Sequence, residues 1–287
     1  MRAERAGRSA GRHSASAWLV CGLLACALPL AARAAGPLAA RAALPLAARA
    51  AGPPAAGAEE PACPPDPGLP ALVLPHLASA LAQGRTVKIV ALGSSSTEGV
   101  MASGPEETYP AELQQALRAA WPGRQIIVIN RGIGGQDARR ELARMGRDVI
   151  AHRPQVAIWQ VGANAALRRH DPDAFRRLVT EGVQRLQRRG IDVVLMDNQR
   201  SPRVLASGDS LVFDRELAEI ARATGAALFS RDRLMRGWAR EGNPAAEFIA
   251  GDKLHHNDLG YRCVAEALAR SLLAGLPHPL PEATADR

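Results

Sequence analysis

The feature that most constrains this chain is a series of short apolar runs that alternate with longer segments of helical character after residue 70. Short apolar runs separated by helices are typical of a parallel sheet that helices cover on both faces. Five runs fit this pattern: Thr86–Leu92, Gln125–Asn130, Gln155–Val161, Ile191–Met196 and Ala226–Phe229. We therefore predict an α/β fold, a three-layer α/β/α sandwich with a mainly parallel five-stranded sheet.

The segments between the runs predict the helices. They are Leu72–Gln83, Tyr109–Trp121, Asp137–His152, Pro172–Arg189, Leu211–Thr224, Leu234–Arg240 and Asn257–Leu276, with residues 198–210 as a loop. In open parallel sheets the ligand crevice lies beyond the carboxyl ends of the strands. The residues that directly follow each strand are therefore the place to look for chemistry.

Residues 1–34 have the pattern of an export signal. Arginines at the start precede an apolar run, Ala15–Leu30, which is short for a membrane span and suits a signal peptide. Ala32-Arg33-Ala34 offers a cleavage site, whereas the four residues that end at Cys26 resemble a lipoprotein box. Both alternatives predict an exported protein, periplasmic or secreted, whose membrane contact is limited to the signal or a lipid anchor at Cys26.

Residues 35–70 are predicted to be an Ala/Pro-rich linker. The heptapeptide Pro-Leu-Ala-Ala-Arg-Ala-Ala starts at Pro29, Pro37 and Pro45. Its prolines interrupt any helix, and its small side chains offer little for a core. The folded domain is therefore expected to span residues 71–287.

The positive charge does not indicate nucleic-acid binding. The formal net charge is +8, but residues 1–34 contribute five arginines against one glutamate. The remaining arginines are scattered in pairs along helices rather than gathered on one face, and aromatic residues make up only 3%. We expect no nucleic-acid partner.

Two cysteines, Cys63 and Cys263, lie outside the predicted signal. Export would allow a disulfide between them, and two unpaired thiols are the alternative. The sequence holds no Cys-x-x-Cys motif or cysteine–histidine cluster that would predict zinc.

The loop after the first strand, Gly93–Gly99, contains three consecutive serines. It could be a simple polar turn or present a serine nucleophile at a strand-to-helix turn, which would need a nearby base. A phosphate loop is excluded, because no Gly-Lys-Ser or Gly-Lys-Thr follows.

The loops after the second and third strands contain candidate oxyanion donors. Asn130–Asp137 includes three glycines, which allow a backbone N–H to approach a reacting oxygen, and Asp137 stands where a dinucleotide motif requires glycine. In Gly162-Ala163-Asn164 the asparagine could bond its own backbone or donate to an oxyanion.

The segment Asp252–Asp258 precedes the last predicted helix. Asp252 and His255 are spaced so that the carboxylate could hold one imidazole tautomer. A metal site that also uses His256 is the competing interpretation, and Asn257 or Asp258 could cap the helix.

Four short blocks of residues 86–275 resemble the SGNH hydrolases, also called the GDSL esterase/lipase family, and stand in the family's order. They are Gly93-Ser94-Ser95, Asn130–Gly135, Gly162-Ala163-Asn164 and Asp252-Lys253-Leu254-His255. The resemblance implies a flavodoxin-like three-layer fold and ester hydrolysis by a serine nucleophile, with no metal or organic cofactor. It implies these roles: Ser95 as nucleophile, His255 as base, Asp252 as the group that orients His255, and Ser95, Gly135 and Asn164 as oxyanion donors.

Two residues depart from the family's pattern. Ser94 replaces an aspartate, and Ala165 replaces the aspartate that commonly follows the asparagine of the third block. These departures motivate the alternative of a non-catalytic envelope binding module. An O-acyltransferase is a further alternative, because a sugar hydroxyl could replace water.

The polar loop Asn198–Ser210, with Gln199, Arg200 and Arg203, is expected to border the pocket. Its polarity favours a small acyl group on a polar alcohol, so the expected substrate is a small-molecule or glycan ester.

Overall fold

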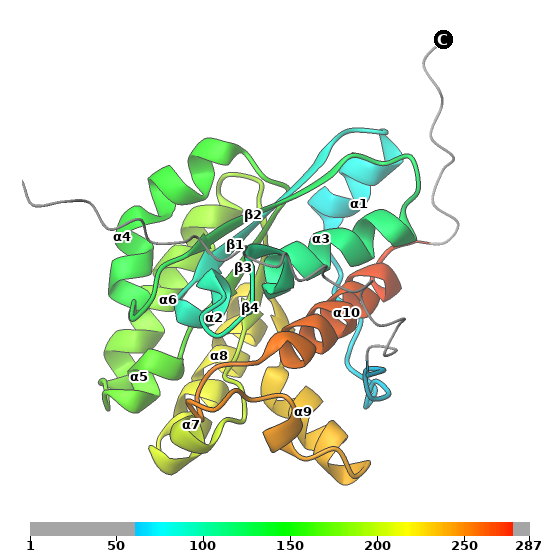
Figure 1. Ribbon diagram of the computed structural model, residues 1–287. Coiled ribbons are helices and arrows are strands. Elements are labelled where there is room, and N and C mark those ends of the chain that lie inside the picture. The colour runs from blue at the N-terminus through cyan, green and yellow to red at the C-terminus, as the bar shows by residue number, and fades with distance from the viewer. Residues whose placement is uncertain (1–60, 278–287) are drawn as a thin grey trace, which may run out of the picture. The chain divides into compact units, whose positions relative to one another are not determined.

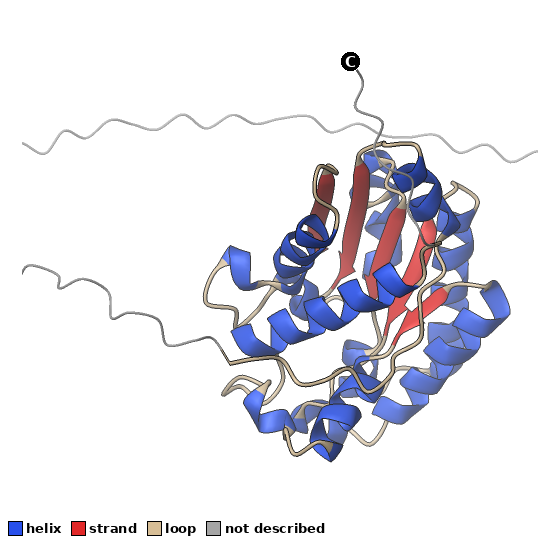
Figure 2. Ribbon diagram, turned by 90° about the vertical axis from the view of Figure 1, so that its right-hand side faces the viewer, coloured by secondary structure: helices blue, strands red, loops and turns tan. Residues whose placement is uncertain are grey.

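The computed structural model describes residues 61–277, and a five-stranded sheet is at its centre (Figures 1 and 2). All neighbouring strands are parallel, in the order β2-β1-β3-β4-β5. This confirms the predicted fold class. The strands are β1 (Val87–Gly93), β2 (Ile126–Gly132), β3 (Val156–Gln160), β4 (Asp192–Met196) and β5 (Ala227–Phe229).

Helices cover both faces of the sheet (Figure 2). Successive side chains of a strand point to opposite faces, so one strand supplies two cores. In β1, Ile89 and Ala91 belong to one buried cluster and Val90 and Leu92 to the other. This two-sided burial explains why the strands read as continuous apolar runs.

The two helical layers are visible on either side of the sheet in Figure 1. One core contains residues of α1 (Pro75–Ala82), α3 (Tyr109–Ala120), α9 (Arg231–Arg240) and α10 (Asp258–Ala274). The other contains residues of α4 (Ala138–Asp148), α5 (Ala163–Leu167), α6 (Pro172–Gln187) and α8 (Ser210–Thr224). All seven predicted helices are present, with ends shifted by a few residues.

The short helices were not predicted. They are α2 (Ser95–Glu98), α5, α7 (Pro202–Ala206) and the 3-10 turns η1 (Pro105–Glu107), η2 (Ile150–His152) and η3 (Ala245–Glu247). Because α7 lies within residues 198–210, the prediction of a loop throughout that segment was wrong. Helices this short depend on tertiary contacts rather than on a periodic apolar pattern.

The predicted signal, residues 1–34, and the predicted linker as far as residue 60 lie outside the described residues. Residues 61–70 form no helix or strand but contact the domain. Leu69 packs against the core, and a Cβ added at Gly237 would lie 2.2 Å from the Pro67 Cβ. Cys63 forms a disulfide with Cys263 of α10, with 5.2 Å between the Cα atoms. Within residues 61–277, no helix has both the length and the apolar character that a membrane span requires.

We expect Cys63→Ala to lower the free energy of unfolding by about 3–5 kcal/mol, because the disulfide closes a loop of 200 residues and constrains the unfolded chain. Urea unfolding of the oxidised wild type and the variant would measure the loss. Reduction of the wild type should produce a similar loss. A difference below about 1 kcal/mol would contradict the expected contribution.

Candidate active site

Ser95 is the first residue of α2, directly after the turn that follows β1. Its Oγ is 2.7 Å from His255 Nε2, although the two residues are 160 positions apart in the sequence. The neighbouring serines are buried and have other contacts: Ser94 Oγ lies 3.1 Å from Gln160 Oε1, and Ser96 Oγ accepts a hydrogen bond from Gln199. Of the three serines, Ser95 is therefore the one in contact with His255.

Asp252 fixes the position of His255 within a tight turn. Asp252 Oδ2 lies 2.5 Å from His255 Nδ1. Its Oδ1 accepts hydrogen bonds from the backbone N–H groups of Leu254 and His255, at 2.9 and 3.0 Å. Burial alone would raise the pKa of Asp252, but these hydrogen bonds outweigh it and hold the pKa below its ordinary value. The carboxylate is therefore ionised at neutral pH and accepts from Nδ1–H, which leaves Nε2 free to accept a proton.

His256 belongs to a different environment from His255. It is fully buried, and its Nδ1 lies 3.0 Å from the carbonyl oxygen of Phe248. Burial lowers the pKa of His256 to about 3, so its ring is neutral. Within residues 61–277, no three histidine, cysteine, aspartate or glutamate side chains are grouped closely enough to bind a metal ion. The structure therefore offers no support for the alternative metal site at this turn.

The glycine loop after β2 passes directly beside the serine turn. A Cβ added at Gly134 would lie 3.9 Å from the Ser95 Cβ and 2.8 Å from Glu98 Oε2. Gly135 has a φ of +70°, which favours glycine. The absence of a side chain at Gly134 lets the backbone of this loop approach Ser95, as an oxyanion donor must.

Asn164, the second residue of α5, is tied to the same glycine loop. Its Nδ2 donates a 2.7 Å hydrogen bond to the carbonyl oxygen of Gln136, the residue after Gly135. An asparagine amide carries two N–H groups, so this bond orients the amide and leaves the second N–H available. The structure thus brings Asn164 and the Gly135 segment together.

Gln199 links the serine turn to the Asp252–His255 turn. Its Nε2 donates to Ser96 Oγ at 3.4 Å and to the carbonyl oxygen of Leu254 at 3.0 Å. Arg200 forms an ion pair with Asp232 at 2.9 Å. The backbone N–H of Arg203 donates to the carbonyl oxygen of Lys253. The segment expected to border the site therefore does contact it. Gln199 itself is buried.

The two departures from the family's pattern have separate structural outcomes. Gln160, at the end of β3, accepts hydrogen bonds from the backbone N–H and the hydroxyl of Ser94, both at 3.1 Å. Thr97 Oγ1 donates to the same Gln160 oxygen at 3.3 Å. Ser94 is thus held by polar contacts although it is not an aspartate. Ala165 is buried and packs with the apolar cluster beneath α5.

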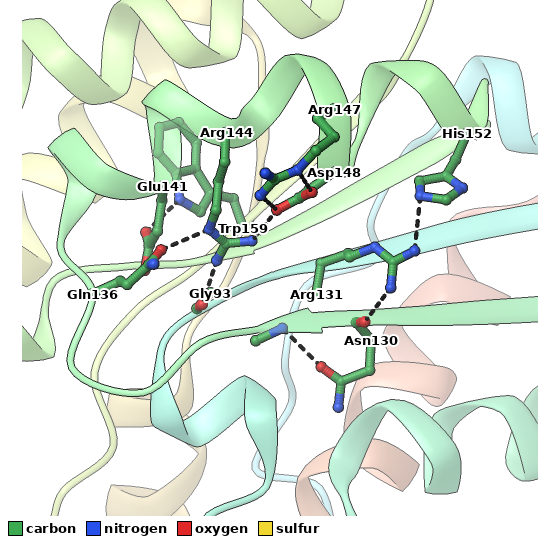
Figure 3. A network of polar contacts seen from close by, with 11 residues as sticks. Gly93, Asn130, Arg131, Gln136, Glu141, Arg144, Arg147, Asp148, His152 and Trp159 are labelled. Carbon is green, nitrogen blue, oxygen red and sulfur yellow. Dashed lines mark hydrogen bonds and ion pairs between the residues drawn. The ribbon is translucent and has the colours of Figure 1, made fainter. Parts of the chain in front are cut away.

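The polar network of α4 that supports the site was not predicted from the sequence (Figure 3). Arg144 is buried and donates to the carbonyl oxygen of Gly93 at 2.9 Å and to Gln136 Oε1 at 2.6 Å. One sequence signal could have indicated it: Arg144 has a carboxylate, Asp148, four positions later on the same predicted helix.

The same helix buries a carboxyl group, Glu141, against Trp159 of β3 (Figure 3). Glu141 Oε2 accepts a 2.8 Å hydrogen bond from the Trp159 indole. Burial raises the pKa of Glu141 from 4.5 to about 7, and the bond to Trp159 only partly offsets this effect. Stability from such a group is present below pH 4.5 and is lost as the pH rises through about 7.

We therefore expect Glu141→Gln, which can still accept from the indole, to become more stable relative to the wild type as the pH rises. The gain between pH 4.5 and values above 7 should reach up to about 3 kcal/mol. Urea unfolding at a series of pH values would measure it. Glu181→Gln on the exposed face of α6 is the control. The difference in free energy of unfolding between this variant and the wild type should stay constant with pH. If the difference in free energy of unfolding between Glu141→Gln and the wild type did not change with pH, the raised pKa of Glu141 would be contradicted.

Hydrogen bonds connect Ser95 to His255 and His255 to Asp252, beyond the strand ends of a parallel five-stranded sheet. This arrangement is similar to that of the SGNH hydrolases. The resemblance predicted from the four sequence blocks is confirmed by a family match. The model of the Non-GDSL lipase-like family matches residues 62–278, most of the chain, and the chain belongs to this family.

Individual relatives agree with this assignment. An Arylesterase of Vibrio mimicus is 26% identical over 208 residues, which are 72% of this chain and 98% of the relative. Among solved structures, the fold is similar to a lipolytic protein of the G-D-S-L family from Desulfitobacterium hafniense DCB-2, with a TM-score of 0.52 and 21% identity over 65% of this chain and 100% of the other. It is also similar to a two-domain esterase active on acetylated mannans, with a TM-score of 0.62 and 22% identity over 75% and 59%. The acetyl xylan esterase AlAXEase has a TM-score of 0.56 and 23% identity over 64% and 99%. Membership of this lipase-like family identifies the chain as a hydrolase of ester bonds.

Proposed function

We propose that the protein is an exported serine esterase that hydrolyses carboxylic esters through an acyl-enzyme. The observation that carries this proposal is the unbroken line of hydrogen bonds from Ser95 Oγ to His255 Nε2, at 2.7 Å, and from His255 Nδ1 to Asp252 Oδ2, at 2.5 Å. A serine hydroxyl is a weak nucleophile at neutral pH unless a base accepts its proton. His255 is in hydrogen-bond contact with that hydroxyl, and Asp252 holds the required tautomer.

In the first step, Ser95 Oγ attacks the ester carbonyl while its proton passes to His255 Nε2. The imidazolium that forms is stabilised by the ionised carboxylate of Asp252. Collapse of the tetrahedral intermediate breaks the bond to the alcohol. His255 returns the proton to the departing alcohol, and the acyl group remains on Ser95.

The negative charge on the former carbonyl oxygen needs donors already in place. We assign these donors to the backbone N–H groups of Ser95 and Gly135 and to the second N–H of the Asn164 amide. Three observations support this assignment: the close approach of the glycine loop to Ser95, the positive φ of Gly135, and the bond from Asn164 to Gln136. In the second step water attacks the acyl carbon while its proton passes to His255. The bond between Ser95 Oγ and the acyl group then breaks, His255 returns the proton to Ser95 Oγ, and the acid is released.

We further propose short-chain or carbohydrate O-acyl esters as substrates. The segment beside the Asp252–His255 turn presents polar side chains at its surface, with Arg203 exposed and Arg200 half-buried in its ion pair with Asp232. Such a border suits a polar alcohol. Two structurally similar proteins are an esterase active on acetylated mannans and an acetyl xylan esterase, which is consistent with this choice.

The substrate proposal predicts that p-nitrophenyl acetate is hydrolysed with at least about tenfold higher kcat/KM than p-nitrophenyl octanoate. A polar border offers little apolar surface to the additional methylene groups, so a longer chain gains little binding. The two esters share one leaving group, so initial rates of p-nitrophenol release compare the acyl groups alone. Faster hydrolysis of the octanoate would contradict the preference for short acyl groups.

Export is also a proposal, based on the pattern of residues 1–34. The Cys63–Cys263 disulfide supports it, because disulfides persist mainly in oxidising compartments outside the cytoplasm. Cell fractionation with an antibody against the folded domain tests it. Export predicts a processed form outside the cytoplasm, and a full-length cytoplasmic protein would contradict it.

A fluorophosphonate probe tests the proposed nucleophile. The probe forms a covalent bond with an activated serine hydroxyl, whereas an unactivated hydroxyl is a weak nucleophile. The mature protein should be labelled, and mass mapping should place the label on Ser95. A folded protein that is not labelled would instead favour the non-catalytic binding module.

A further inference from the structure

Arg144 of α4 is buried next to the site, and its guanidinium contacts two of the site's loops (Figure 3). Its side chain is 6% exposed. A buried guanidinium is costly unless its N–H groups have partners. Arg144 has three: Nε donates to Gln136 Oε1 at 2.6 Å, Nη2 to the carbonyl oxygen of Gly93 at 2.9 Å, and Nη1 to Asp148 Oδ2 at 2.9 Å.

One of these partners, Gly93, belongs to the serine turn. Gly93 ends β1 and stands two residues before Ser95. Its carbonyl oxygen also accepts a 3.0 Å hydrogen bond from the backbone N–H of Ile133, in the glycine loop. The Gly93 carbonyl oxygen therefore connects the serine turn to the glycine loop, and Arg144 is the second group that donates a hydrogen bond to it.

Another partner, Gln136, belongs to the glycine loop itself. Gln136 directly follows Gly135, and its own carbonyl oxygen accepts the 2.7 Å hydrogen bond from Asn164 Nδ2. A movement of Gln136 would therefore shift the Gly135 backbone and release the Asn164 amide together. Arg144 holds Gln136 by its side chain, which leaves the carbonyl oxygen free to bind Asn164.

We propose that Arg144 is a positioning residue for ester hydrolysis, one that fixes the Gly135 and Asn164 donors relative to Ser95 by bridging Gly93 and Gln136. This inference rests on the proposed function. The planar fork of a guanidinium reaches partners in several directions at once, whereas a lysine ammonium would not reproduce this geometry. Displacement of a catalytic group by about 1 Å can cost about 10²-fold in rate.

Arg147 provides a matched control on the same helix. It also pairs with Asp148, at 2.7 Å, but its side chain is 76% exposed. Neither Gly93 nor Gln136 is among its hydrogen-bond partners within the described residues. The hydrogen bond from Arg147 lowers the pKa of Asp148 to about 2, with a further contribution from Arg144 against the opposing effect of burial. Asp148 is therefore ionised at working pH. A role limited to this ion pair would affect both arginines, whereas the proposed role affects Arg144 alone.

The test measures kcat and KM for p-nitrophenyl acetate in the full chain and its variants. Arg144→Met keeps the apolar stem and removes all donors; it should lower kcat by about 10–10²-fold with KM within about threefold. Arg144→Lys should not restore the rate. Arg147→Met should leave both constants within about twofold. Thermal unfolding establishes that each variant is folded at the assay temperature.

A second variant keeps the proposal testable if Arg144→Met does not fold. Gln136→Met retains the backbone carbonyl that binds Asn164 but loses the acceptor for Arg144, and should lower kcat by about tenfold. In the double variant, Gln136→Met should add little to Arg144→Met, because both break the same link.

The outcomes separate this proposal from the proposed function. If the wild type neither hydrolyses the ester nor binds the fluorophosphonate at Ser95, both are overturned. If the wild type is active and labelled but Arg144→Met keeps kcat within about threefold, only the role of Arg144 is overturned. An equal loss of kcat in Arg144→Met and Arg147→Met would also overturn it.

Discussion

Ser95→Ala is expected to lower kcat for p-nitrophenyl acetate by on the order of 10⁶-fold, because it removes the atom that forms the bond to the acyl group. The Ser95 hydroxyl is the one that contacts His255 Nε2. Steady-state hydrolysis would measure the loss, with the wild-type protein prepared in parallel. KM is expected to change little, since the hydroxyl contributes chiefly to the transition state.

Ser94→Ala is the matched control for this prediction. Ser94 is the adjacent serine, but its hydroxyl is bonded to Gln160 rather than to His255. Loss of that bond should cost at most about tenfold in rate. A large loss in Ser94→Ala, with little loss in Ser95→Ala, would show that the nucleophile is assigned to the wrong serine.

Asp252→Asn is expected to lower kcat by about 10⁴-fold. The asparagine oxygen can still accept the backbone N–H groups of Leu254 and His255. Its NH₂ group then faces His255 Nδ1, which must become an acceptor, so the ring's proton moves to Nε2. A protonated Nε2 cannot accept the proton of Ser95. The loss thus arises from the wrong tautomer and not from a change in the fold.

Asp258→Asn controls for the removal of a nearby negative charge. Asp258 begins α10, and its Oδ1 accepts a 2.8 Å hydrogen bond from the backbone N–H of Ser103. This variant should keep kcat within about tenfold of the wild type. If Asp252→Asn were equally mild, Asp252 would not be the group that orients His255.

Sequence patterns were sufficient for the sheet but not for the short helices. Strands such as β1 and β3 are buried on both faces, so their residues form apolar runs that identify them. The four residues of α2 and the five of α7 are too few for a periodic pattern. Their conformation depends on neighbours far away in the sequence, such as Gln160 and Gln199 beside α2.

The sheet topology predicted which loops of the site lie at one edge of the sheet. It did not predict the contacts between their side chains. Parallel strands place Ser95, the Gly135 segment and Asn164 at one edge, so a shared site could be expected from their positions after strands. The bond between Ser95 and His255 joins residues of different loops and follows from no local pattern. Arg144 was missed because one of its acceptors is a backbone carbonyl, that of Gly93, 51 positions earlier, and backbone acceptors leave no mark in a sequence.

Trapping the acyl-enzyme would show whether Ser95 carries the acyl group during turnover. The wild-type protein is mixed with excess p-nitrophenyl acetate, quenched with acid within the first turnovers, digested and analysed by mass spectrometry. We expect one added acetyl group on the peptide that contains Ser95, at the Ser95 hydroxyl, and none in Ser95→Ala. An actively hydrolysing protein whose acetyl group is found on another residue would contradict this role of Ser95.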